Sequence, residues 1–338
     1  MVMAAFIAFL AFLGLGFDYL YLSSGAAPVA VPVGTTLALM YGGGSAVYSY
    51  FRGDRAVLAS AMAMNVPEIL ARAGSAADGL GTTQLQNVFQ LRQFQNVVEE
   101  MAIAAGLPVP QTYLVPDPDP NAFATGRDPE HASIAVTKGL LEMLTREQLQ
   151  GVIAHEMAHI RNHDVRLMTV VAALVGAIAL ISDWAGRAFR HGGPRAMDRG
   201  SARGGKKGGG NVLFLALIIV WLVAIALAPI ISHMLATMVS RRREFLADAT
   251  GAELTRNPLA LASALEVIEA EAGATKAIKQ GSAHLCIADP LERRVNQREG
   301  WLADLFATHP PMHKRIEALR AMAYQGFGPR STNVAELG

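Results

Sequence analysis

The stretch His155-Glu156-Met157-Ala158-His159 has the residue spacing of a metal-binding helix, and it is the most informative part of this chain. A helix turns every 3.6 residues, so side chains four positions apart lie one above the other on the same face. Two imidazoles arranged in this way can bind one zinc ion. Glu156 lies beside them, where its carboxylate can take a proton from a metal-bound water. The plainer alternative is a solvated helix that carries two histidines and a glutamate by chance.

The residues before this stretch predict a buried helix. Thr145 to Gln148 have the pattern of a capping box, in which the threonine hydroxyl and the glutamine side chain satisfy the first free amides. Apolar residues then recur at helical spacing, namely Leu149, Val152, Ile153, Met157 and Ile160. Histidines and a glutamate beside such a stripe lose their water, which is costly unless something binds them. A metal ion removes that cost.

A candidate for a third ligand lies in segment 240–249, which also has a helical pattern. Glu244 and Asp248 are four residues apart there and share a face. A glutamate that binds zinc, with an aspartate one turn later that accepts a histidine ring N–H, is a common arrangement. The alternative is a surface helix in which Glu244 pairs with a neighbouring arginine. A lone Cys286 excludes an internal disulfide and a cysteine-based zinc site.

Four motifs in a fixed order give the chain a family resemblance. They are HEMAH followed by Asp164, RRREFLADATGA from Arg241, the segment Asn121-Ala122-Phe123-Ala124-Thr125-Gly126, and His309-Pro310-Pro311 with Arg315-Ile316. In these motifs, from about Gln111 to Leu319, and in a hydrophobic N-terminal hairpin, the chain resembles the HtpX heat-shock membrane metalloproteases. These are relatives of the eukaryotic CAAX prenyl protease. The basic, glycine-rich insert from Pro194 to Gly210 departs from the family pattern.

The resemblance implies a zinc metalloendopeptidase with one Zn²⁺ per chain. It implies that His155, His159 and Glu244 hold the ion, that Glu156 is the general base, and that Asp248 supports a ligating histidine. On that basis we expect zinc-dependent peptide hydrolysis, in which three ligands leave one position on the metal for water. Glu156 then takes a proton from the water and returns it to the leaving amine.

The resemblance also implies contacts to the substrate. Ala122, Phe123 and Ala124 are expected to form an edge strand near the cleft, to which an extended polypeptide adds as another strand through backbone hydrogen bonds. An ordinary hairpin arm is the alternative for this segment. Candidates for contacts to the oxyanion or the substrate are Asn121, His309 and Arg315. The alternative for His309 and Arg315 is a helix N-terminus with Arg315 in a salt bridge.

The predicted fold is an α-helical membrane protein with an α+β zincin-like (gluzincin) catalytic domain, in which the HExxH helix lies beside a small antiparallel sheet. A helix is expected at Leu85–Ala105, and another starts at Asn257-Pro258. Strands are expected at 112–115, 121–125 and 133–136, with a turn at 126–129 between the last two.

Composition is typical of a membrane enzyme. Apolar residues make up 52% of the chain and charged residues 17%, against roughly a quarter charged in soluble domains. A net charge of +1 gives no indication of nucleic-acid binding. Four apolar segments are candidate spans, at 1–16, 29–51, 167–181 and 212–235. The first lacks the basic start of a signal peptide, so we expect an anchor.

These segments divide the chain as follows. We expect a transmembrane hairpin at 1–51, a catalytic domain at 52–164 and 236–325, a second hydrophobic hairpin at 165–235, and a flexible tail at 326–338. Arg52 and Arg55 follow the second segment, while the connection from Phe17 to Val31 has no basic residue. The positive-inside rule then places the N-terminus and the catalytic domain in the cytoplasm.

The connection between the last two segments disagrees with that rule. Its glycine-rich part at 186–210 is strongly basic, and a full crossing would place these charges outside. Either the flanks of the catalytic domain outweigh this loop, or the short segment 167–181 does not span. Its composition is typical of an unstructured connector, and binding to anionic headgroups is the alternative.

The expected function is cleavage of misfolded or damaged membrane proteins at the bacterial inner membrane, as protein quality control under stress. The expected partners are unfolded or membrane-protein substrates and the lipid bilayer. A specific CAAX-type processing protease is one alternative, although such enzymes enclose their site with many more spans. An inactive zinc-binding scaffold is another, although the motif retains the glutamate that only catalysis requires.

Overall fold

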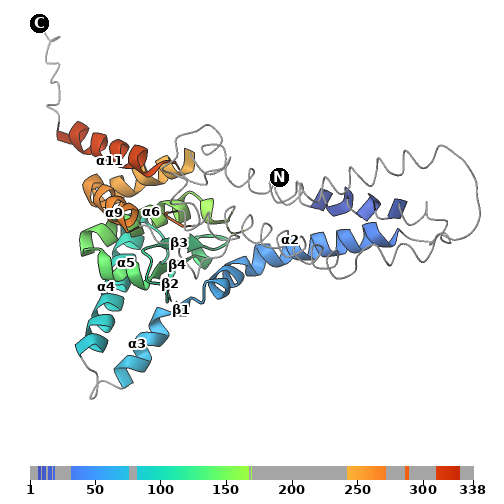
Figure 1. Ribbon diagram of the computed structural model, residues 1–338, viewed down its shortest axis with the longest axis horizontal. Helices are drawn as coiled ribbons and strands as arrows, with labels where there is room; N and C mark the ends of the chain where they lie inside the picture. Colours follow the sequence, from blue (N-terminus) through green and yellow to red (C-terminus); the bar gives the residue numbers. More distant parts are fainter. Residues whose placement is uncertain are drawn as a thin grey trace, which may run out of the picture.

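The computed structural model describes parts of residues 7–19 and then residues 32–75, 82–166, 169, 242–271, 286–288 and 310–327 (Figure 1). Most of segment 167–181, all of 212–235, the basic loop 186–210 and the tail 328–338 lie outside the described residues. Within the described part of the chain, no helix has both the length and the apolar character needed to cross a bilayer.

The second apolar segment falls on helix α2 (Val33–Ser60). Asp18, two residues after the first apolar segment, accepts hydrogen bonds from the main-chain N–H groups of Gly34 at 2.6 Å and Thr35 at 2.7 Å. Pro32 precedes the helix and provides no side-chain cap. Asp18 therefore satisfies amides that a helix start leaves free, and the two apolar segments lie side by side (Figure 1).

A small sheet supports the rest of the molecule. Its strands are β1 (Met64–Asn65), β2 (Gln111–Val115), β3 (Ala122–Thr125) and β4 (Ser133–Thr137). Strands β2, β3 and β4 confirm the three predicted strands, and each of their ends lies within one residue of the predicted end. The order is β1-β2-β4-β3, with β2 and β4 parallel and the two other pairs antiparallel.

The sheet is therefore mixed, and the prediction of an antiparallel sheet is wrong. The cause lies in the turn after β2, where Pro116, Pro118 and Pro120 alternate with aspartates. Proline fixes φ and has no N–H to donate, so this turn cannot form a tight two-residue hairpin. The chain instead returns as β3, which is not a neighbour of β2 in the sheet. Strand β4 lies between the two and runs parallel to β2.

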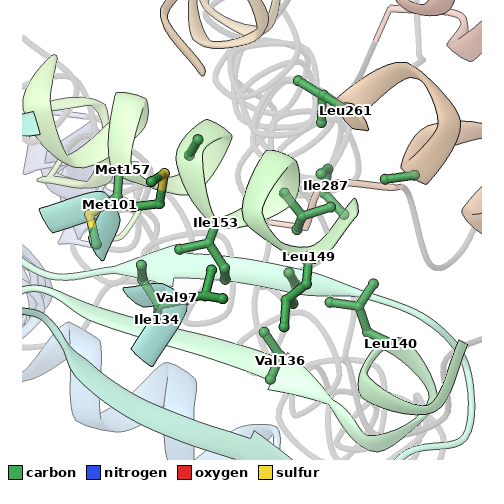
Figure 2. Close-up of a cluster of buried hydrophobic side chains, with 14 of the residues drawn as sticks. Val97, Met101, Ile134, Val136, Leu140, Leu149, Ile153, Met157, Leu261 and Ile287 are labelled. Atoms are coloured by element: carbon green, nitrogen blue, oxygen red, sulfur yellow. The ribbon is translucent and has the colours of Figure 1, made fainter. Parts of the chain in front are cut away.

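Helix α6 (Arg146–Arg161) carries the HEMAH stretch and begins with the predicted capping box. Thr145 Oγ1 accepts from the Gln148 N–H at 3.3 Å, and Gln148 Oε1 accepts from the Thr145 N–H at 2.9 Å. All five residues of the predicted apolar stripe are buried. In Figure 2, Leu149 and Ile153 of α6 lie against Ile134 and Val136 of β4, so this stripe fixes the helix on the sheet.

Further helices enclose α6. The predicted helices are confirmed as α4 (Thr82–Ala105) and α9 (Pro258–Ala270), with Asn257 as the N-cap of α9. Helix α11 (Met312–Phe327) packs on α9, which packs on α6 (Figure 1). The shorter elements are α3 (Val66–Ser75), the 3₁₀ turn η2 (Pro129–His131) and α5 (Lys138–Met143).

Two glycines allow the helices around α6 to approach it closely. A Cβ at Gly151 of α6 would lie 2.8 Å from the main-chain nitrogen of Leu261 in α9. A Cβ at Gly251, in the helical residues 242–255, would lie 3.0 Å from the main-chain nitrogen of His155. The second contact brings the helix that carries Glu244 directly against the HEMAH stretch.

We predict that Gly151→Ala lowers the stability of the fold by about 1–3 kcal/mol, because an added methyl group must push the backbone of α9 away. The measurement is the midpoint of thermal unfolding followed by circular dichroism. Gly74→Ala is the matched control, since Gly74 lies in α3 with open space around its Cβ and alanine favours a helix. Equal midpoints for the two variants would contradict this account of the α6–α9 contact.

Candidate metal centre

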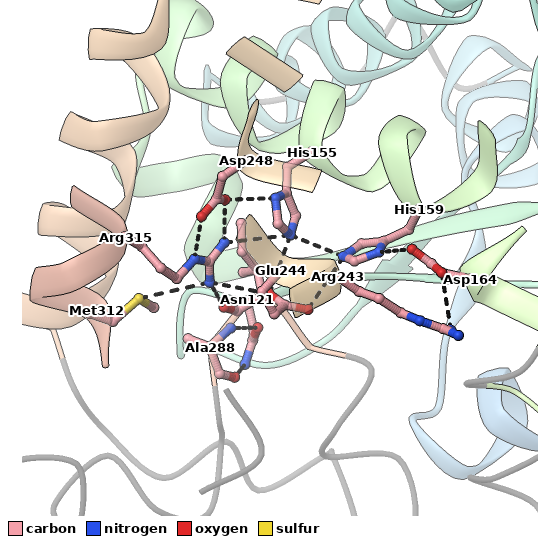
Figure 3. A network of polar contacts seen from close by, with 11 residues as sticks. Asn121, His155, His159, Asp164, Arg243, Glu244, Asp248, Ala288, Met312 and Arg315 are labelled. Carbon is pink, nitrogen blue, oxygen red and sulfur yellow. Dashed lines mark hydrogen bonds and ion pairs between the residues drawn. The ribbon is translucent and has the colours of Figure 1, made fainter. Parts of the chain in front are cut away.

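Three buried side chains converge where α6 meets the helical residues 242–255. The Nε2 atoms of His155 and His159 are 3.2 Å apart. Glu244 Oε2 lies 3.6 Å from Nε2 of His155, and its Oε1 lies 3.5 Å from Nε2 of His159. Each of the three residues is at most 3% exposed. The structure thus brings together the three ligands that the sequence predicted, as Figure 3 shows.

The opposite nitrogens of the two rings face carboxylates. Nδ1 of His155 lies 2.9 Å from Oδ1 of Asp248, and Nδ1 of His159 lies 3.3 Å from Oδ2 of Asp164. Because an ionised carboxylate only accepts, it favours a proton on each Nδ1. Both Nε2 lone pairs then point at one another, an arrangement that a shared cation stabilises.

The distances fit a tetrahedral metal ion. Two nitrogens bound about 2.0–2.1 Å from one such ion lie about 3.3 Å apart, close to the separations between these three side chains. Without an ion, burial lowers the pKa of His155. Burial also opposes charge on His159, but the carboxylates of Asp164 and Glu244 raise its pKa to about 10. The donor set of two imidazoles and one carboxylate suits zinc.

Glu156 lies beside these ligands and is 1% exposed. Its carboxylate accepts a hydrogen bond from the main-chain N–H of Ala124 in β3, while Oε2 has no hydrogen-bond partner among the described residues. Burial raises the pKa of Glu156 to about 7, against the opposing charge of His159. A carboxylate that is anchored on one side and has a vacant oxygen is suited to proton transfer.

Arg315 of α11 contacts two carboxylates of the site and is completely buried. It donates to both oxygens of Asp248, from Nε at 2.8 Å and from Nη2 at 2.7 Å. Burial favours the neutral acid, yet this guanidinium holds the pKa of Asp248 at about 2. Nη1 of Arg315 also lies 3.5 Å from Glu244 Oε2. Arg315 is therefore in the salt bridge that the sequence left open as an alternative, and its Nη2 also lies 3.5 Å from Nε2 of His155.

The remaining predicted residues are placed differently. Asn121 is fully buried, and its amide holds a neighbouring loop, donating to the Ala288 carbonyl at 3.0 Å and accepting from the Ala122 N–H at 3.0 Å. These contacts are structural. His309 lies outside the described residues.

The predicted edge strand is at the end of the sheet, but it is not exposed. Ala122, Phe123 and Ala124 are at most 3% exposed. Residues Cys286–Ala288 cover this edge, with a bridge between Phe123 and Cys286. The expected edge strand is therefore at the edge of the sheet, and a segment distant in sequence fills the place beside it.

Asp164 is a site residue to which the sequence analysis gave no role. His163 adopts a positive φ of 58° after the end of α6, and this turn brings Asp164 back beneath His159. Arg243 lies 3.0 Å from the other oxygen of Asp164. The signal was present in the sequence, since an aspartate shortly after the second histidine is within reach of its ring and a histidine ligand usually has such a partner.

Known proteins resemble this chain. Residues 90–323 match peptidase family M48. A protein named Protease HtpX homolog, from Caldanaerobacter subterraneus subsp. tengcongensis, is 45% identical over 229 residues, which cover 67% of this chain and 71% of that protein. A protein of the same name from Streptococcus gordonii is 37% identical over 321 residues, 95% of each chain. The crystal structure of S. mikatae Ste24p matches with a TM-score of 0.38 and 17% identity, covering 84% of this chain and 64% of that one.

We predict that Arg315→Met destabilises the fold by about 3–5 kcal/mol, because it leaves the Asp248 carboxylate buried without its cation. Arg320→Met is the control on the same helix, where the exposed pair with Glu266 contributes about 1 kcal/mol or less. Thermal unfolding of both variants measures the difference. A stable Arg315→Met protein with normal metal content would show that Arg315 does not position this site.

Proposed function

The chain belongs to peptidase family M48 and is a metalloprotease, and on that basis we propose a zinc-dependent endopeptidase that is bound to a membrane and degrades misfolded or damaged membrane proteins. The observation that carries the proposal is the meeting of two histidine Nε2 atoms and the Glu244 carboxylate, with the vacant oxygen of Glu156 beside them. We further propose that His155, His159 and Glu244 are the metal ligands and that Glu156 is the general base.

The choice of zinc rests on the donor set. Imidazole nitrogen with one carboxylate is a usual ligand set of catalytic zinc, and three protein ligands leave one position vacant. Metals that prefer an all-oxygen shell, such as Mg²⁺ and Ca²⁺, suit these residues poorly. The carboxylates of Asp164 and Asp248 fix the histidine rings with Nε2 toward the ion.

When bound, zinc lowers the pKa of a coordinated water to about 7 and polarises the scissile carbonyl. Glu156 accepts the proton of the attacking water on its vacant Oε2 and then donates it to the leaving amine. The Ala124 N–H holds the other side of this carboxylate and keeps it in place through both transfers. Arg315 and Asp248 keep the His155 ring from turning, so that the ligand geometry is retained.

The membrane attachment is supported by helix α2. Several apolar side chains in its first half are exposed, including Leu37 at 61% and Met40 at 69%. Just beyond them, the Arg127 guanidinium lies 5.7 Å from the Phe51 ring and that of Arg166 lies 5.0 Å from the Tyr50 ring. Aromatic and basic side chains at the end of an apolar stretch are typical of a membrane–water boundary. We place the catalytic domain on the cytoplasmic side of a bacterial inner membrane.

We predict that Glu156→Gln lowers the cleavage rate of an unfolded protein such as casein by at least about 10²-fold while metal content is retained, because only the proton acceptor is lost. Glu244→Gln is expected to lose both metal and activity. Glu253→Gln is the control, since Glu253 is exposed on the same helix. The measurements are bound zinc by elemental analysis and cleavage by the protein in detergent.

Three other results would contradict this assignment. Full activity of Glu156→Gln would remove Glu156 as the base, and undiminished zinc in Glu244→Gln would remove Glu244 as a ligand. Zinc in the wild type without cleavage of casein, but with cleavage of a prenylated C-terminal peptide, would indicate a processing enzyme in place of a quality-control protease.

We also predict the topology of the chain. Reporter fusions within residues 192–210 are expected to indicate the periplasm, and fusions after Phe327 the cytoplasm, because the two halves of the metal site must lie on one side of the membrane. Paired alkaline phosphatase and fluorescent-protein fusions measure this. A cytoplasmic signal from both positions would show that the segments at 167–181 and 212–235 do not cross.

A further inference from the structure

The outer edge of β3, on the side away from β4, is paired with a short segment of the same chain. Residues Cys286–Ala288, here named the strap, run antiparallel to β3, with Phe123 opposite Cys286. The Ile287 N–H donates to the Ala122 carbonyl at 2.9 Å. All three residues of the strap are at most 3% exposed. The strap thus makes the main-chain contacts that an added strand makes.

The strap ends close to the proposed base. Successive residues of a strand direct their main-chain groups to opposite edges, and the Asn121 carbonyl accepts from the Thr137 N–H on the β4 side. The groups of Ala122 and Ala124 therefore face outward together. The Ala122 carbonyl is taken by the strap, and the Ala124 N–H is taken by Glu156. The strap and Glu156 therefore contact the same edge of β3, at two residues that are two positions apart.

The strap is also tied to the metal centre. Nη1 of Arg315 donates to the Ile287 carbonyl at 3.0 Å, and the same nitrogen lies 3.5 Å from Glu244 Oε2. Asn121 Nδ2 holds the Ala288 carbonyl at 3.0 Å. In Figure 3, Asn121, Ala288 and Arg315 lie together beside Glu244. A peptide that approaches the metal centre along β3 would meet the strap in its path.

We propose that the strap occupies the position of the substrate strand and must leave β3 before a polypeptide can be cleaved. The protease is then held in check by its own chain, and only the fraction with an undocked strap binds substrate, which weakens apparent affinity by that fraction. An unfolded polypeptide competes for the same edge through its main chain. This inference rests on the proposed function, because it concerns how substrate reaches the same site.

The chain offers a direct test through its single cysteine. Phe123 and Cys286 form a non-hydrogen-bonded antiparallel pair, since the Ile287–Ala122 bond flanks them. Cα atoms of such pairs are about 4.5 Å apart, within the range of a disulfide. In Phe123→Cys, oxidation is expected to lock the strap and lower casein cleavage at least 10-fold relative to the reduced form of the same protein. Reduction is expected to restore it.

The control is Phe123→Cys combined with Cys286→Ser, which has no redox response if the lock is the cause. Equal activity of the oxidised and reduced forms, with the disulfide verified by mass, would overturn the proposal and make the strap a permanent strand. Absence of cleavage by the wild type would instead contradict the proposed function, so the two failures are distinguishable.

A second measurement needs no change in β3 and remains decisive if Phe123→Cys fails to fold. In Glu156→Gln, which binds substrate without turnover, the buried Cys286 is alkylated with a maleimide and the labelling rate is followed by mass. Saturating cysteine-free unfolded polypeptide is expected to raise this rate several-fold, because it displaces the strap. A folded protein that is not cleaved is the control. An unchanged or slower rate with the unfolded polypeptide would overturn the proposal.

Discussion

Charge balance in a dry interior is the constraint on which this structure depends. Four carboxylates meet at the centre, from Glu156, Asp164, Glu244 and Asp248. Among the described residues, Arg243 pairs with Asp164, and Arg315 pairs with Glu244 and Asp248. Buried charges are tolerated only when they are paired or bind a metal. A divalent cation bound between the two histidines would balance the remaining negative charge. The same ion would account for the close approach of the two Nε2 atoms, which are 3.2 Å apart.

The scaffold meets this constraint by bringing three distant segments together. Helix α6 is fixed on the sheet by its apolar stripe, and Gly251 lets the helix of Glu244 and Asp248 lie directly against His155. Helix α11 then inserts Arg315 behind Asp248. Each contact depends on the previous one, because a buried carboxylate without its partner is strongly destabilising. Binding of the proposed metal ion would therefore be coupled to the folding of this region.

In the proposed mechanism, the edge of β3 connects this centre to the substrate. Its outward main-chain groups serve two purposes, since Ala124 holds the proposed base and Ala122 holds the strap. Arg315 contacts the strap, Glu244 and Asp248 at once. Release of the strap would therefore remove the hydrogen bond between Arg315 and the Ile287 carbonyl. Access of substrate and the geometry of the ligands are physically linked through this guanidinium.

The sequence alone was sufficient for features that depend on near neighbours in the chain. Helical spacing placed His155 and His159 on one face, the Thr145 capping box marked the start of α6, and the predicted strands lie where the structure has them. The likeness of four motifs to a family pointed to Glu244, and the structure brings it to the histidines. Tertiary structure decided the parallel pairing of β2 with β4, the partner of Asp248 and the burial of β3 beneath the strap. These features depend on which distant segments meet. Close approach of the backbones and the pairing of buried charges decide those contacts, and the spacing of residues along the chain does not encode them.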